Sequence, residues 1–167
     1  MSASGKPPQN VMPTPEAMQH LQEQAKAAIV KLPLLGPMAF LMGHHPVKRF
    51  NFIGDLEWML MPPLILDQAK VYTRNDAPVG FATWAFVNDE IDKRFSSGNL
   101  KIGPTEWKTG PHLWLIDLVV PFGSQEDIVK DLREKVFAGK KVKMLVPDPT
   151  GKAAKIAEWS SVQPSKK

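Results

Sequence analysis

Asp117 is the residue whose type and place in the sequence point most directly to chemistry. It lies in the middle of the apolar run LWLIDLVV, residues 113–120. A carboxylate inside a buried strand is costly unless it is paired or hydrogen-bonded. Strict alternation along a strand predicts that Asp117 shares a face with Leu115 and Val119. Two interpretations stay open: a structural carboxylate that pairs with a nearby cation, or a carboxylate that orients or handles a proton.

The adjacent histidines His44 and His45 form the second candidate site. Pro46 suits the first position of a helix, which would place His45 at the N-cap. Histidine is a poor N-cap beside Ser or Asp, so this mismatch singles out His45. Two surface histidines in a loop are the plainer interpretation. No further histidine or acidic residue has a spacing that would complete a metal site, so none is predicted.

Several classes of active site are excluded by residues and motifs that the sequence lacks. The 167 residues contain no cysteine, which excludes disulfides, cysteine-based zinc sites and a cysteine nucleophile. Glycine-rich dinucleotide loops, a Walker motif and a G-x-S-x-G elbow are also absent. No apolar run approaches the ~18 residues of a membrane span, and the N-terminus has no signal-like apolar region. We therefore expect a cytoplasmic protein without stable membrane insertion.

The positive charge of the chain is concentrated near its C-terminus. The whole chain carries a net charge of +4. Residues 140–167 contain seven lysines against two acidic residues, a net charge of +5. Such a segment attracts an acidic partner, which can be nucleic acid, an anionic membrane or an acidic carrier protein. A solvated lysine-rich surface explains the same pattern.

The elements that would position these residues follow from caps, turns and periodicity. We predict a disordered tail over residues 1–13, one domain over 14–160 and a polar tail over 161–167. The domain is predicted to begin with helices, continue with a hairpin and end with strands on either side of a helix. The expected helices cover about 14–31, 37–42, 88–95 and the segment after Ser124, and the expected strands cover 69–74, 79–86, 113–120, 142–146 and 155–159. This order favours an α/β (α+β) fold in which helices flank a mixed, largely antiparallel sheet.

Four ordered stretches resemble one known family. They are LLGPMAFLMGHHPVKRF, YTRNDAPVGFATWAF, HLWLIDLVVPFG and LVPDPTGKAAKIAEW, which together run from about Leu35 to Trp159. They are similar to the lysine acyltransferases that activate RTX-type pore-forming toxins, such as haemolysin. The Pro-Val-x-aromatic-x-Ser/Thr-Trp-Ala pattern is met from Pro78, and the Trp-x-Ile-Asp pattern is met at Asp117.

The resemblance implies a fold similar to that of the Gcn5-related N-acyltransferases. It implies transfer of a fatty acyl group from acyl-acyl carrier protein to an internal lysine of an RTX-type protoxin. The carrier-bound donor is then a substrate, and no bound cofactor is expected. The basic C-terminal segment would suit an acidic carrier, nucleic acid is not expected as a partner, and a homodimer stays open.

The family motif Ser-Pro-x-His-Arg is altered in this chain. The matching residues begin at His45, and Lys48 stands where the family has its catalytic histidine, the partner of the aspartate that corresponds to Asp117. Three outcomes stay open. His45 can replace the histidine from one helical turn away, which we prefer; Lys48 can act as a neutral amine, and can itself be acylated; or the protein is a non-catalytic relative that binds acyl carrier protein or a toxin-like partner.

Overall fold

A single long helix, α1, leads into the sheet. The computed structural model describes residues 14–147 and 154–160, so the predicted tails at 1–13 and 161–167 lie outside the described residues. α1 runs from Pro15 to His44. Its start is as predicted, because the hydroxyl of Thr14 accepts a hydrogen bond from the N–H of Ala17.

The prediction of two separate helices in this region is wrong, because α1 continues through Pro33 and Pro37. A proline inside a helix removes a hydrogen bond and costs about 3 kcal/mol. The C-terminal part of the helix offsets this cost by burial, since Met38 and Leu41 are fully buried against the sheet. Tertiary packing therefore overrides the local signal for a break.

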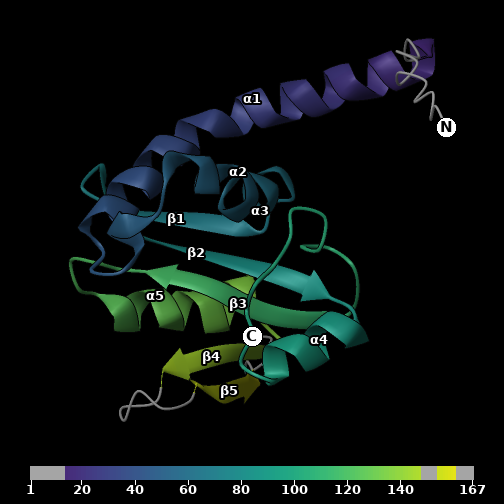
Figure 1. The fold of residues 1–167 in the computed structure, drawn as a ribbon. Helices are drawn as coiled ribbons and strands as arrows, with labels where there is room; N and C mark the ends of the chain where they lie inside the picture. The colour runs from purple at the N-terminus through teal and green to yellow at the C-terminus, as the bar shows by residue number, and fades with distance from the viewer. Residues whose placement is uncertain (1–13, 148–153, 161–167) are drawn as a thin grey trace, which may run out of the picture.

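The sequence patterns predicted no apolar run long enough to span a membrane, and α1 differs from this prediction. By length and apolar content, α1 could cross a membrane, a test that core helices of other proteins also pass. Only a small share of its most apolar window is buried. Figure 1 shows its N-terminal part extending beyond the sheet.

Short helical segments connect α1 to the sheet and cover it. After α1 come η1 (Lys48–Phe50), η2 (Ile53–Asp55), α2 (Leu56–Met59), α3 (Met61–Ile65), α4 (Asp89–Ser96), α5 (Gln125–Asp131) and the π-helical turn η3 (Leu132–Val136). The predicted charged helix is confirmed in α4, where the side chain of Asn88 caps the N–H of Ile91.

Five strands form one sheet in the order β1-β2-β3-β4-β5. β3 and β4 are parallel and the other neighbours are antiparallel. This confirms the predicted mixed, largely antiparallel sheet flanked by helices. The strands are β1 (Ala69–Arg74), β2 (Ala77–Val87), β3 (His112–Val119), β4 (Lys141–Pro147) and β5 (Ala154–Ser160).

Helices pack on both faces of the sheet and create separate apolar clusters. α1, α2 and α3 bury one cluster that includes Phe81 of β2 and Val119 of β3. A second cluster, which includes Leu115 of β3, is buried by Ile128 of α5 and by η3. A third lies between α4, Trp107 and the sheet. Figure 1 shows α1 and α5 on different sides of the central strands.

A polar cluster on Asp131 ties α5 to the strand β1. Lys70 Nζ and Tyr72 Oη both donate to Oδ2 of Asp131, at 2.5 and 2.9 Å. Lys135 lies 3.0 Å from the other oxygen. Burial alone would raise the pKa of Asp131, but hydrogen bonds from Lys70, Lys135 and Tyr72 outweigh it and lower this pKa to about 2. The ionised carboxylate therefore stabilises the fold.

This cluster predicts a specific loss of stability in acid. Since the folded-state pKa of Asp131 lies below its ordinary value, its contribution is present above about pH 4 and is lost as the pH falls towards 2. The shift corresponds to about 2 kcal/mol of unfolding free energy. Urea unfolding of the wild type and of Asp131→Asn between pH 2 and 6 gives the free energy of unfolding of each. The free energy should fall more steeply in acid for the wild type than for the variant.

Asp127→Asn is the matched control for this prediction. Asp127 lies on the same helix but is mostly exposed, and its contact with Arg74 is long at 3.4 Å. The control should keep the pH dependence of the wild type. Identical pH dependence of wild type and Asp131→Asn would contradict the assignment.

Candidate functional site

Asp117 lies in the interior of the sheet, on the central strand β3. It is 8% exposed and pairs in register with Thr83 of β2, which is fully buried. Asp117, Thr83 and Gln68 are the buried polar or charged residues of the described chain. The predicted position of Asp117 in a buried strand is confirmed, and the carboxylate needs a partner there.

The predicted alternation along β3 is wrong at this point. The register between β2 and β3 shifts between Thr83 and Trp84, so that Ile116 is inserted as an extra residue. Such a β-bulge re-aims the side chains beyond it. Leu115 therefore packs in the cluster under α5, whereas Val119 packs in the cluster under α1. The bulge places Asp117 on the side of the sheet from which η1 reaches it.

Lys48 supplies the partner. Its Nζ donates a hydrogen bond to Oδ1 of Asp117 and forms an ion pair with it. The two side chains are 24% and 9% exposed. Lys48 begins η1, the turn that follows the end of α1, and the two residues are 69 positions apart. Of the three predicted site residues, the structure thus brings Lys48 and Asp117 together.

His45 makes a different set of contacts. Its Nδ1 accepts hydrogen bonds from the backbone N–H groups of Val47 and Lys48, both at 3.2 Å. The N–H of Arg49 also bonds to the carbonyl of His45, at 3.2 Å. The ring thus caps the turn that presents Lys48, as a side chain at an N-cap does. Accepting at Nδ1 places the proton of the neutral ring on Nε2.

His44 faces another group of side chains. Its ring nitrogen Nδ1 lies 2.9 Å from the carbonyl oxygen of Phe40. The ring packs between Phe40 and Phe122, with centroid distances of 4.5 and 5.2 Å. The adjacent histidines therefore do not act as one cluster. Over residues 14–147 and 154–160, no group of three or more His, Cys, Asp or Glu could hold a metal ion.

A small cavity and an apolar surface lie beside Lys48. The cavity has a volume of about 140 Å³, and Lys48, Arg49 and Asn51 line it together with apolar residues of α1, the η2 region and α2. The segment that carries Lys48 also exposes large apolar side chains. Their exposed fractions run from 68% for Val47 to 88% for Ile53. Chemistry at Lys48 would therefore take place next to a surface that favours an apolar ligand.

The strands β3 and β4 separate beside Asp117. Their pairing ends at Leu115 and Met144, whereas the pairing of β3 with β2 continues to Val119. β4 itself continues to Pro147, paired with β5. The part of β3 that carries Asp117 thus lies beyond the last residue pair that it forms with β4.

Two lysines of the basic C-terminal segment are used within the fold. Lys143 Nζ binds both carboxylate oxygens of Asp92, at 2.8 and 2.9 Å, and Lys141 pairs with Glu158. Burial would raise the pKa of Asp92, but hydrogen bonds from Lys143 and Trp114 lower it. The expectation that Lys143 belongs to a free docking patch is corrected by this ion pair.

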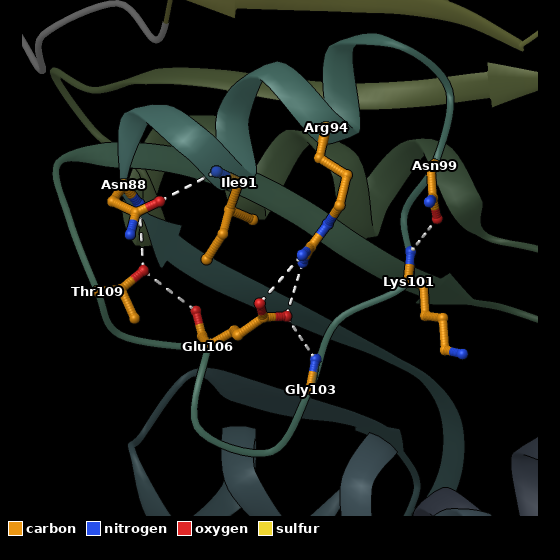
Figure 2. A network of polar contacts seen from close by, with 8 residues as sticks. All are labelled: Asn88, Ile91, Arg94, Asn99, Lys101, Gly103, Glu106 and Thr109. Carbon is orange, nitrogen blue, oxygen red and sulfur yellow. Dashed lines mark hydrogen bonds and ion pairs between the residues drawn. The ribbon is translucent and has the colours of Figure 1, made fainter.

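A polar network holds the loop between α4 and β3 in place (Figure 2). The sequence patterns did not predict this network. Arg94 donates two hydrogen bonds to the carboxylate of Glu106, at 3.1 and 2.6 Å. The N–H of Gly103 donates to the same carboxylate at 2.7 Å. Hydrogen bonds from Arg94 and then from Gly103 lower the pKa of Glu106. A cavity of about 440 Å³ separates this loop from Trp58 of α2, and Asp117 does not line it.

The fold and the site define a class of protein. A mixed sheet with flanking helices, and with a pair of parallel strands that separate beside a buried carboxylate, is consistent with the Gcn5-related N-acyltransferases. The chain belongs to the RTX toxin acyltransferase family, whose model matches residues 27–160. The predicted resemblance is confirmed.

Individual relatives agree with this assignment. An uncharacterized protein of Synechocystis sp. is 33% identical over 123 residues, which cover 72% of this chain and 84% of that protein. The lysine-acyltransferase RtxC of Vibrio cholerae is 30% identical over 105 residues, covering 62% and 69%. The protein-lysine myristoyltransferase HlyC of Escherichia coli is 25% identical over 128 residues, covering 77% and 75%.

The cap made by His45 can be tested apart from any chemical role. His45→Ala should lower the unfolding free energy by about 1 kcal/mol, the usual value of a cap. His45→Asn should keep the stability, because an asparagine oxygen accepts the same backbone hydrogen bonds. Urea unfolding measures both variants. Loss of acyl transfer by a stable His45→Asn variant would show that an imidazole is needed at this position and would contradict a purely structural role.

Proposed function

We propose that this chain transfers a fatty acyl group from acyl-acyl carrier protein to the ε-amine of an internal lysine of an RTX-type protoxin in the cytoplasm. The family assignment supports the reaction class. The observation that carries the proposal is the contact between Lys48 and Asp117. The position at which the family has its catalytic histidine still presents a proton-carrying side chain to the aspartate.

The separation of β3 and β4 supports a place for the donor. A pantetheine arm contains two amides, and these can hydrogen-bond to the edge of β3 beyond Leu115, where β3 has no strand partner on the β4 side within the described residues. The thioester at its end would then lie beside Asp117. The acyl chain can extend over the apolar surface next to Lys48. Since a carrier-bound donor has no free pyrophosphate to hold, the missing glycine-rich loop agrees with this donor.

We propose Lys48, rather than His45, as the proton acceptor. Nδ1 of His45 already accepts two backbone hydrogen bonds, so protonating it would break the cap. Lys48 has to be neutral to accept a proton. Docking of the donor would exclude water from the pair, and a drier environment disfavours two opposite charges that can neutralise each other by passing a proton from Lys48 to Asp117.

The transfer step then needs one proton relay. The amine of the acceptor lysine attacks the thioester carbonyl carbon, and Lys48 takes the proton that this amine loses. The bond between carbon and sulfur breaks, and the carrier thiolate leaves and is protonated. The proton that Asp117 received from Lys48 goes to the carrier thiolate, and the resulting carboxylate holds the protonated Lys48 in place and stabilises its positive charge. Water exclusion by the acyl chain protects the thioester from hydrolysis.

Substitutions at the pair test these roles. Asp117→Asn and Lys48→Ala should each lower the transfer rate by about 10²–10⁴-fold, the usual worth of a general base. Lys48→Arg should lower the transfer rate by as much, because a guanidinium does not release its proton. Lys48→His should keep or raise the rate, since it restores the family residue. Mass spectrometry of an RTX-type protoxin incubated with acyl-acyl carrier protein measures the rates.

Lys143→Arg is the matched control. Lys143 is 23% exposed, about as much as Lys48, but it lies on β4 and pairs with Asp92, a partly buried carboxylate that is 15% exposed at its side chain. The Lys143→Arg variant should transfer the acyl group at the wild-type rate. An inactive wild type together with an active Lys48→His variant would favour the alternative of a non-catalytic relative that binds acyl carrier protein or a toxin-like partner. Full activity of Lys48→Arg would exclude Lys48 as the proton acceptor.

Carrier docking can be tested by calorimetry. Acyl-acyl carrier protein should bind more tightly than coenzyme A, because the chain has no pyrophosphate loop. Charge reversal of the exposed Lys155 should weaken carrier binding, and more so at low salt. Lys101→Glu, on the loop before β3, should have no effect. Tight binding of coenzyme A without carrier binding would contradict the proposed donor.

A further inference from the structure

We propose that Lys48 is itself an acyl acceptor, and that this chain attaches one acyl group to its own Lys48 when it is loaded with a donor thioester. The inference rests on the proposed function for the identity of that donor. It differs from the proposed function in its product, because the acyl group remains on this chain.

The position of Lys48 is the first argument. Its Nζ contacts Asp117, the carboxylate of the proposed transfer site, which lies just beyond the end of the pairing between β3 and β4. An acceptor lysine from another protein has to reach this point from outside. Lys48 is already there, so its amine reacts at a high effective concentration. Any donor placed for transfer is therefore also placed for attack by Lys48.

The partner of Lys48 is the second argument. An ammonium group cannot attack a carbonyl until it loses a proton, so a carboxylate that can take this proton inside the transfer site favours the reaction. Lys48 has Asp117, which is 9% exposed at its side chain. When the donor covers the pair and excludes water, transfer of the proton to the carboxylate removes both charges from a dry site. The amine that remains is a nucleophile.

The covalent step balances without any further reactant. Neutral Nζ of Lys48 attacks the carbonyl carbon of the acyl thioester. A carbon–nitrogen bond forms, the carbon–sulfur bond breaks, and the second proton of the amine leaves with the carrier thiol. The product is an amide, Nε-acyl-Lys48, and Asp117 later returns its proton to solvent.

The surroundings of Lys48 can hold the product. The cavity of about 140 Å³ is lined by Lys48 itself, by the polar residues Arg49 and Asn51, and by apolar side chains that include Met42 and Ile53. It has room for the first part of an acyl chain. The rest of the chain can cover the exposed side chains of Phe50 and Phe52, which are 76% and 81% exposed. Covering these side chains would stabilise the product by apolar burial.

The modification would end transfer by the modified molecule. An amide is not an acyl donor, so the group on Lys48 is not passed on. The amide nitrogen carries no positive charge and no longer pairs with Asp117. Self-acylation is therefore expected to be stoichiometric, one group per chain, and to lower the rate of later transfer to an acceptor.

The test is incubation of the full chain with myristoyl-acyl carrier protein in the absence of any acceptor, followed by intact-mass and peptide mass spectrometry. The expected result is one myristoyl group, located on Lys48. Lys48→Arg and Asp117→Asn should each reduce this modification by on the order of 100-fold or more. Lys143→Arg, the matched ion-pair control, should leave it unchanged.

Other lysines of the chain provide an internal standard. Lys135 and Lys141 are 75% and 64% exposed at their side chains, against 24% for Lys48. Chemical acylation by the thioester alone would favour these exposed amines. Modification spread over them, or modification that persists in Asp117→Asn, would overturn the proposal.

A parallel reaction that also contains an RTX-type protoxin separates this inference from the proposed function. Acylated protoxin with unmodified Lys48 would overturn the inference and leave the proposed function standing. Acylated Lys48 with unmodified protoxin would support the inference and contradict transfer to that acceptor. If neither protein is modified although the donor binds, both proposals fail.

Discussion

The ion pair of Lys48 with Asp117 is the interaction on which the arrangement of the site depends. It joins the turn after α1 to the central strand across 69 residues of sequence. A local feature of the backbone positions each partner. The ring of His45 caps the turn that presents Lys48, and the bulge at Ile116 directs Asp117 towards Lys48. Leaving either partner alone would place an uncompensated charge in a largely buried position, which is strongly destabilising.

Other carboxylates organise the scaffold around this pair. Asp131 ties α5 to β1, Asp92 ties α4 to β4, and Glu106 holds the loop before β3. The lysines that pair with Asp131 and Asp92 come from distant parts of the chain, so these two contacts help to set the positions of α5 and α4 relative to the sheet. They also show that the net positive charge of the chain overstates the number of lysines available to a partner. A lysine such as Lys143 adds to the net charge of the chain, but its charge is directed inward.

A lysine at position 48, where the family motif has histidine, changes the chemistry that the site can perform. An imidazole and a primary amine both carry protons, but an amine beside a carboxylate stays charged until water is excluded. Donor binding would then be the event that activates the site. The amine is also a stronger nucleophile and forms a stable amide. A site of this kind would combine acyl transfer to an external acceptor lysine with acylation of its own Lys48.

Much of this protein was predictable from the sequence, because its strands and caps are local features. The hairpin, the strand that carries Asp117, the Asn88 cap and the mixed sheet follow from periodicity and turn chemistry, and the family follows from ordered motifs. Tertiary structure alone decided three points. Packing of Met38 and Leu41 carries α1 through two prolines, the bulge at Ile116 breaks the alternation, and the ion pairs select Lys48 as the partner of Asp117. Each depends on contacts between residues far apart in the sequence, whose energies outweigh local preferences and which no local pattern encodes.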